Sequence, residues 1–296
     1  RNAVKIVIGV NPGESSDDAM ALGSVLCRAF GAEPALAHIH PSAYDYASPG
    51  HVDAEWESYL VEDSHALLAR AQRDAAERYG MVDLPTLVYG HRSSGVGLYE
   101  LAEAHDADML VIGSAPGASS GRFQIGSTAD QLLHGSHVPV ALAPAYYRGI
   151  CPEELGRLVV AFQNTEESRS TVLAAAELAE AAELPLTLLT ILLRHRIYGS
   201  NIRHGEDMVM GQLKSETEAE QARLLAQLPE TLRADAMVSS GDDAMSAVRR
   251  YDWNGDELFV LASARGGILR RVFLGDMTYK LLRATQVPAI VMPRLT

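Results

Sequence analysis

The sequence has little of several residue types, and each shortage excludes a class of protein. Its 296 residues include two cysteines, Cys27 and Cys151, which are too few for a disulfide framework and lack metal-binding spacing. No run of about 18 apolar residues is present, so a membrane-spanning helix is not expected. The first residues do not read as a secretion signal. We therefore expect a cytoplasmic protein with no membrane partner.

Positive charge is also scarce. The chain has 38 acidic and 25 basic residues, for a net charge of −13. A surface of this charge repels a phosphate backbone, so we expect no nucleic-acid partner. The absence of a GxxxxGK[ST] sequence excludes a Walker-type NTPase. Apolar residues make up 47% of the chain, which is enough for a packed core and excludes wholesale disorder.

The two halves of the chain repeat one another. Residues 108–144 align with residues 257–293 without a gap, at a constant offset of 149. The alignment places Gly126 over Gly275. Agreement over 37 ungapped positions indicates a tandem duplication rather than the general likeness of any two strand–helix units. The sequence therefore predicts two domains, at residues 1–148 and 155–296.

Apolar strands and amphipathic helices alternate in both halves. A continuous apolar run such as residues 4–10 is typical of a parallel strand buried on both faces. We therefore predict the α/β class: two tandem doubly wound domains, each a mainly parallel five-stranded sheet with helices on both faces. In the first half the predicted strands are 4–10, 35–39, 84–89, 109–112 and 138–143, and the predicted helices are 14–30, 53–79, 98–105 and 127–135. In the second half we predict strands at 158–162, 186–191 and 258–261, a loop at 194–208 and a helix at 209–228.

A doubly wound sheet binds its ligand beyond the carboxyl ends of its strands. Three strand ends of the first half offer candidate binding residues, at residues 10–12, 38–40 and 112–114. The third opens a glycine-rich loop, which runs from Gly113 to Gly126 and is followed by Ser127 and Thr128 at a helix start. Glycine lets backbone approach a phosphate closely, and a helix N-terminus offers N–H groups and a favourable dipole. The Ser-Thr pair either donates hydroxyls to phosphate or caps the helix, and composition leaves both open. Residues 14–18 supply N-cap candidates for the first helix.

Gly113, Gly126 and Ser127 fit the nucleotide-binding signature of the universal stress protein family, which reads Gly, two residues, Gly, nine residues, Gly, then Ser or Thr. The chain resembles a tandem universal stress protein over nearly all of its length, apart from residues 41–56 and 194–208. The resemblance implies a fold similar to adenine nucleotide α-hydrolase-like domains, with ATP, alone or with magnesium, as ligand. It also implies that the closing strands pair within the chain and that this unit forms a homodimer.

Carried over position by position, the resemblance implies a nucleotide site in the first half. Asn11 stands where the family has aspartate, and Ile39 matches the position whose backbone meets adenine. Pro116 replaces the middle glycine, so the loop must follow a different path. Arg122 is either a phosphate partner or a solvated surface side chain. The predicted binding residues are Val10, Asn11, Pro12, Ile39, Ile112, Gly113, Ser114, Gly117, Arg122, Gly126, Ser127 and Thr128.

The second half departs further from the signature. Ala262 replaces its first glycine, Arg265 its second, and Asp276 follows the third. A carboxylate at that position repels phosphate, although Arg265, Arg270 and Arg271 offset part of the charge. The first strand of this half ends in Gln163 and Asn164, again without aspartate. We therefore expect a degenerate second site.

Other motifs are weaker. His38 and His40 share one strand face, as a metal pair or as ordinary packing. Gly95 and Gly97 faintly resemble a dinucleotide fingerprint. The sequence pairs no nucleophile with a base, so we predict no catalytic residues and at most slow ATP hydrolysis. Two functions remain: an ATP-binding regulatory module that acts in stress through nucleotide occupancy and assembly, and an interaction protein of the same fold that binds no nucleotide.

Overall fold

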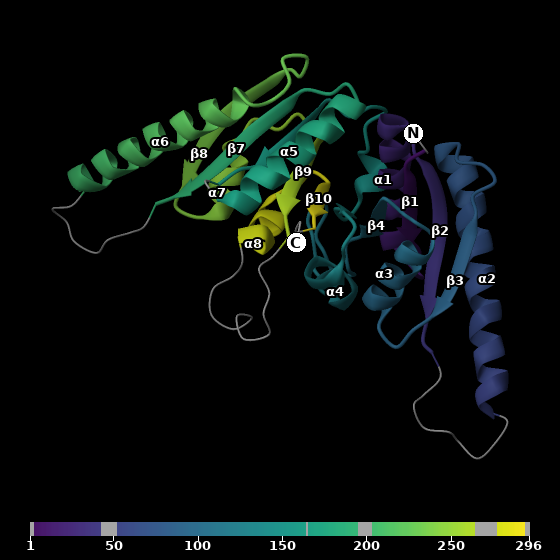
Figure 1. Ribbon diagram of the computed structural model, residues 1–296. Helices are drawn as coiled ribbons and strands as arrows, with labels where there is room; N and C mark the ends of the chain where they lie inside the picture. The colour runs from purple at the N-terminus through teal and green to yellow at the C-terminus, as the bar shows by residue number, and fades with distance from the viewer. Residues whose placement is uncertain (1–2, 43–51, 164, 195–202, 264–276, 294–296) are drawn as a thin grey trace. The chain divides into compact units, whose positions relative to one another are not determined.

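The computed structural model describes residues 3–42, 52–163, 165–194, 203–263 and 277–293 (Figure 1). The chain divides into two compact units, Arg1–Glu153 and Glu154–Thr296. Each unit contains a parallel sheet of five strands flanked by helices. No helix among the described residues is long and apolar enough to cross a membrane.

Unit 1 alternates strands and helices along the chain. Its elements are β1 (Lys5–Gly9), α1 (Glu14–Phe30), β2 (Glu33–His40), α2 (Val52–Tyr79), β3 (Thr86–Gly90), α3 (Ser94–Ala104), β4 (Met109–Gly113), α4 (Ser127–Gly135), β5 (Val140–Ala143) and the 3-10 turn η1 (Tyr147–Gly149). The strand order is β3-β2-β1-β4-β5. The chain builds outward from β1 to β3 and then crosses to β4, so the order reverses between β1 and β4.

The strands of unit 1 are buried beneath helices, and their side chains are accordingly apolar. Ile6 and Ile8 on β1 and Leu110 on β4 are each 1% exposed or less. Helix α1 packs on β1 and β4, and its Leu22 and Leu26 are fully buried. Helix α1 ends at Phe30, because Gly31 adopts the left-handed conformation that terminates a helix.

Unit 2 repeats this plan. Its elements are β6 (Arg157–Ala161), α5 (Glu166–Ala181), β7 (Leu186–Leu193), α6 (Arg203–Leu225), β8 (Ala234–Gly241), α7 (Ala244–Arg249), β9 (Glu257–Ala262), α8 (Met277–Ala284) and β10 (Ala289–Met292). The strand order is β8-β7-β6-β9-β10, which is that of unit 1. The prediction of two doubly wound α/β domains is confirmed. Asn164, Arg265, Arg270, Arg271, Gly275 and Asp276 lie outside the described residues.

Most predicted boundaries lie within three residues of the observed ones, but two helices begin at least four residues earlier than predicted. The predicted loop at 194–208 ends early, because α6 begins at Arg203. The sequence from Arg203 to Asp207 contains no apolar side chain that would have indicated a helix. Helix α3 begins at Ser94 rather than at residue 98, and it contains both glycines of the weak dinucleotide motif. A Cβ on Gly95 would lie 2.6 Å from Gln131 Cβ, and one on Gly97 would lie 2.7 Å from Ile39 Cγ2. These glycines let α3 pack closely on α4 and β2.

Candidate functional site

The predicted binding residues of unit 1 lie at one edge of its sheet. Strands β2, β1 and β4 are neighbours and parallel, so their carboxyl ends meet at the same edge. The order of the sheet reverses between β1 and β4, which is where doubly wound folds bind ligands. Residues 10–12, 39 and 112–114 therefore come together at this edge, ahead of the glycine loop and α4.

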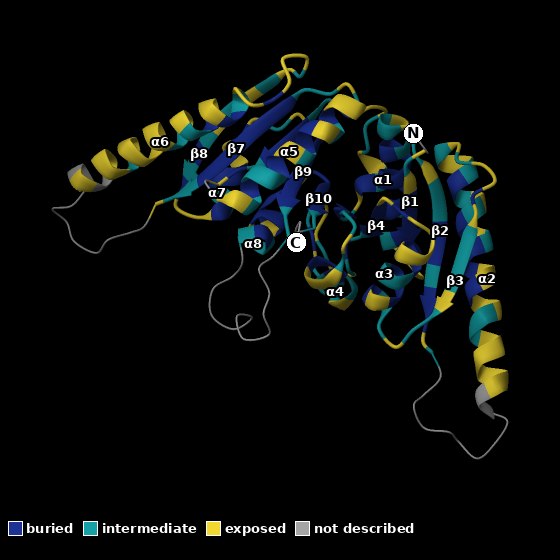
Figure 2. Ribbon diagram, in the orientation of Figure 1, coloured by how far each residue is buried: buried dark blue, intermediate teal, exposed yellow. Residues whose placement is uncertain are grey.

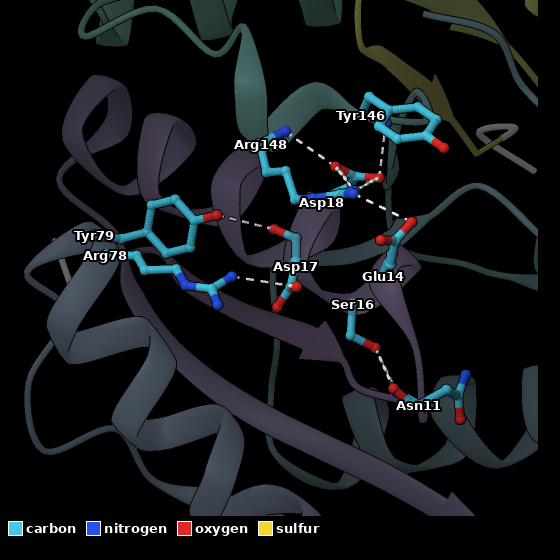
Figure 3. Close-up of polar contacts among 9 residues, drawn as sticks. All are labelled: Asn11, Glu14, Ser16, Asp17, Asp18, Arg78, Tyr79, Tyr146 and Arg148. Carbon is cyan, nitrogen blue, oxygen red and sulfur yellow. Dashed lines mark hydrogen bonds and ion pairs between the residues drawn. The ribbon is translucent and has the colours of Figure 1, made fainter. Parts of the chain in front are cut away.

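The turn after β1 is closed by one serine. The Asn11 N–H donates to Ser16 Oγ over 2.7 Å, and the Ser16 hydroxyl donates to the Asn11 carbonyl over 2.6 Å (Figure 3). Ser16 is buried, whereas Asn11 and Pro12 are exposed. The expectation that residues 14–18 cap α1 is wrong, because the N-cap is Gly13 and no side chain caps the helix. Ser16 binds the preceding turn instead.

The backbone carbonyl of Ile39 lies beyond the last hydrogen bond between β1 and β2. The β1–β2 register ends at Gly9 and Ala37, and the Val10 N–H donates to the Ala37 carbonyl over 2.7 Å. Alternate residues of a parallel strand face the same neighbour, so Ile39 faces the β1 side, as Ala37 does. The next ladder donor on β1 would be residue 12, which is proline and has no N–H. Beyond Val10, the β1 strand therefore supplies no donor to the Ile39 carbonyl.

Gly113 ends β4 directly beneath α1. A Cβ at this position would lie 2.0 Å from the Ser15 carbonyl oxygen, a distance that no side chain tolerates. The glycine lets the first turn of α1 approach the end of β4. Ile112, the residue before it, is buried. A close approach of the Gly113 backbone to a phosphate was predicted. In this structure the close approach is to Ser15 of α1.

The glycine loop is a closed turn that is anchored at both sides. The Ala115 N–H donates to the Gln124 carbonyl over 2.9 Å, and the buried Ser114 hydroxyl accepts from the Gln124 N–H over 2.7 Å. The Gly121 N–H donates to the Ala145 carbonyl over 2.8 Å, and the Ala145 N–H donates to the Arg122 carbonyl over 2.9 Å. Gly117 has a φ of 92°, which favours glycine. The loop is thereby held against the segment after β5.

Helix α4 begins without a side-chain cap. Its N-cap is Gly126, which has no side chain, so the described residues show no side-chain cap at this end. The exposed Ser127 occupies the first helical position, and the Thr128 hydroxyl bonds instead to the Ser94 hydroxyl over 2.5 Å. Of the two alternatives for the Ser-Thr pair, helix capping is therefore the one the structure contradicts. Thr128 ties α4 to α3.

His38 and His40 both bond to backbone. The His38 ring lies 2.7 Å from the Val10 carbonyl through Nδ1, and His40 Nδ1 lies 2.9 Å from the Pro41 carbonyl. Burial lowers the pKa of His38 below its usual value of 6.5, although the bond to Val10 and the charge of Asp63 oppose this shift. The described residues contain no cluster of three or more side chains suited to hold a metal ion.

A buried ion pair that sequence reasoning missed fixes α1 next to this edge. The Asp18 carboxylate, 3% exposed, accepts from the N–H groups of Tyr146 and Arg148 over 2.9 and 3.0 Å and from the Arg148 guanidinium over 3.1 Å (Figure 3). Arg148 also pairs with Glu14 in the first turn of α1, at 3.2 Å. No sequence pattern links residues 18 and 148, because they lie near opposite ends of the sequence of unit 1.

The corresponding end of unit 2 differs in its helix cap. The Gln163 N–H donates to Ser168 Oγ over 2.8 Å, which repeats the turn that Ser16 closes in unit 1. Helix α5, however, carries a side-chain cap, since Thr165 accepts from the Ser168 N–H over 3.2 Å. Strand β9 ends at Ala262, where β4 ends in glycine.

Comparison with known proteins agrees with this architecture. The sequence model of the universal stress protein family matches the chain twice, over residues 4–144 and 154–293. Universal stress proteins of Mycobacterium tuberculosis and Mycobacterium bovis are each 32% identical over 97% of this chain and 99% of their own length. A universal stress protein of Archaeoglobus fulgidus, solved by crystallography, shares the fold at 14% identity, with a TM-score of 0.64 and complete coverage of both chains. The chain belongs to the universal stress protein family, with two such domains in tandem.

Proposed function

We propose that unit 1 binds one adenine nucleotide, ATP, at the carboxyl edge of β1, β2 and β4, and that occupancy of this site is the regulatory event in a stress response. The observation that carries the proposal is the N-terminus of α4, which lies beyond a glycine loop and has no side-chain cap. Because the N-cap is glycine, the N-cap residue offers no side-chain acceptor to the first N–H groups of the helix. A phosphate satisfies such donors and is favoured by the helix dipole.

The phosphates would lie against the glycine loop and α4. Gly126 and Ser127 present backbone N–H groups there, and the exposed Ser127 hydroxyl adds a further donor. Gly113, Ser114 and Gly117 shape the loop rather than bind directly, since Gly113 accommodates Ser15 and the Ser114 hydroxyl is engaged by Gln124. Magnesium, if it accompanies ATP, would be carried by the phosphates.

The base would lie beyond the end of β1. The Ile39 carbonyl receives no donor from β1 at this point, and the exocyclic amino group of adenine is a donor of suitable chemistry. Val10 and Ile112, both buried at strand ends, supply an apolar floor. Asn11 and Pro12 are exposed at the rim, where the Asn11 amide is available to a ribose hydroxyl.

Unit 2 is proposed to bind no nucleotide. Asp276 aligns with Ser127 in the sequence, and a carboxylate at that position repels phosphate. Thr165 caps α5, whereas no side chain caps its counterpart α1 in unit 1. The chain would therefore bind one ATP, and the two domains would differ in role.

Ser127→Asp tests the proposal, because it places the residue of unit 2 into unit 1. An acidic residue in the first turn of a helix stabilises the helix by about 0.3–1 kcal/mol, so the fold is retained. We expect ATP binding to fall by about tenfold or more, which corresponds to about 1.4 kcal/mol of repulsion. Ser127→Ala, the matched control, removes the hydroxyl without adding charge and should weaken binding less than Ser127→Asp does. Equal ATP affinity for all three proteins in equilibrium binding contradicts the site.

The same titration distinguishes the proposed ATP-binding function from the alternative, an interaction protein that binds no nucleotide. Retention of no adenine nucleotide in native mass spectra, together with no saturable binding at millimolar ATP, would favour it.

A further inference from the structure

Helix α2 is longer than the sheet that it covers. Its 28 residues extend about 42 Å, whereas the eight residues of β2 and the five of β3, on which it packs, extend about 26 and 17 Å. In Figure 1 the N-terminal end of α2 extends beyond the carboxyl end of β3, and Figure 2 shows this end as exposed. Residues 54–59 are all exposed, and the first buried side chain of the helix among those described is Ser64.

Two aromatic rings occupy this uncovered end. Trp56 and Tyr59 are 49% and 56% exposed, and their rings stack with centroids 5.4 Å apart and an interplanar angle of 20°. Trp56, Leu60 and Ser64 follow one another at intervals of four residues, so Trp56 continues the face that α2 turns to the sheet. The core-facing stripe of the helix thus runs on past the sheet and ends in a stacked, solvent-exposed aromatic pair.

Carboxylates flank the pair along the helix, and in the part of the chain that the structure describes no lysine or arginine forms an ion pair with them, although the charge of Asp63 acts on the His38 ring. Glu55, Glu57, Glu62 and Asp63 are all exposed, and none of the ion pairs found among the described residues involves them. Between Arg28 and Arg70 the sequence has seven acidic residues and neither lysine nor arginine. The helix dipole accounts for acidic residues in the first turn only, whereas Glu62 and Asp63 lie almost three turns into α2.

We propose that this end of α2, centred on Trp56 and Tyr59, is a docking surface for an arginine-bearing segment of a partner protein. A guanidinium group stacks on an aromatic face and at the same time pairs with a neighbouring carboxylate. Lysine satisfies only the charge, because its ammonium group is compact and strongly hydrated. The aromatic pair therefore selects arginine, and the four carboxylates steer the basic segment to it.

A second copy of this chain is a poorer occupant than a basic partner. Two copies meeting through this face would bring four carboxylates against four, in a chain whose net charge is already −13. The surface does not depend on the nucleotide site, so its function can be tested separately.

Labelled nona-arginine and nona-lysine peptides test the proposal on the full-length chain at physiological salt. The two peptides carry equal charge, so general attraction to an acidic protein affects both alike. We expect the chain to bind nona-arginine about tenfold more tightly than nona-lysine, as measured by fluorescence anisotropy. The double variant Trp56→Ala/Tyr59→Ala should lose this preference. The variant Glu55→Gln/Glu57→Gln should weaken binding of both peptides while keeping the preference.

Met208→Ala/Val209→Ala is the matched control, since these exposed apolar residues lie near the start of α6, the equivalent helix of unit 2. It should change neither affinity. Circular dichroism should show all variants to be folded, because the substituted side chains are exposed. Equal binding of the two peptides by the unaltered chain overturns the proposal, as does a preference that survives loss of both rings. Sedimentation that shows self-association abolished by Trp56→Ala/Tyr59→Ala would also overturn it, by assigning the face to a second copy.

Discussion

Asp18 and Arg148 join the first helix of unit 1 to the segment that follows its last strand. The Asp18 carboxylate accepts hydrogen bonds from the backbone N–H and the guanidinium of Arg148, and also from the N–H of Tyr146. Burial disfavours the charge of Arg148, yet Asp18 and then Glu14 outweigh this and raise the pKa of its guanidinium. The pair holds α1, whose first turn packs on Gly113, beside the glycine loop that is anchored at Ala145.

Asp18→Ala should therefore destabilise unit 1 strongly. It leaves two backbone N–H groups without their acceptor and leaves the partly exposed Arg148 guanidinium with Glu14 alone, which we expect to cost about 2–4 kcal/mol. Urea unfolding measures the loss, and amide hydrogen exchange at Arg148 locates it. Asp17→Ala is the control, because the adjacent Asp17 forms only a partly exposed pair with Arg78, at 3.3 Å, and should cost less than about 1 kcal/mol. Equal losses for the two variants would show that the buried pair has no special role.

Gly113→Ala should damage unit 1 through packing rather than through the ligand. Its Cβ would lie 2.0 Å from the Ser15 carbonyl, so α1 must shift. We expect a loss of about 1–3 kcal/mol in the free energy of unfolding, even without nucleotide. Gly135→Ala is a comparison at the end of α4, where a Cβ meets nothing within 4 Å, and it should not destabilise. A fully stable Gly113→Ala chain that fails to bind ATP would instead assign this glycine to ligand contact.

His38 should make unit 1 less stable in mild acid. Burial lowers its pKa in the folded chain below 6.5, so as the pH falls through 6.5 the unfolded chain takes up a proton before the folded chain does. Stability from this group is therefore full above pH 6.5 and declines as the pH falls toward the folded pKa. NMR titration of the ring should give a midpoint below 6.5. Between pH 7.5 and 5.5, His38→Gln should lose less stability than the unaltered chain, and an equal loss would contradict the assignment.

The fold was predictable from sequence because the hydrophobic periodicity indicates alternating strands and helices and the internal repeat indicates two copies of one domain. Helix α1 could be placed at residues 14–30 from its apolar pattern and from Gly31. The start of α6 could not, since the sequence from Arg203 to Asp207 has no apolar residue and therefore no helical periodicity. The start of α3 was hidden by Gly95 and Gly97, whose role is close packing with residues distant in the sequence.

The sequence predicted that the candidate binding residues lie at one edge of the sheet, but it did not predict their contacts. The family signature located Gly113, Gly126 and Ser127 at one edge of the sheet. It could not show that Ser16 closes the turn at Asn11 or that Thr128 is held by Ser94, because both contacts depend on side-chain geometry. The pair of Asp18 and Arg148 spans nearly the whole domain sequence and leaves no local pattern.

The stoichiometry of ATP binding to the full chain decides whether unit 1 binds one ATP while unit 2 binds none. Isothermal titration calorimetry of the chain and of Ser127→Asp measures it. We predict one site per chain for the unaltered protein and loss of that site in the variant. No saturable binding, two sites per chain, or one site that Ser127→Asp leaves unchanged would contradict the account.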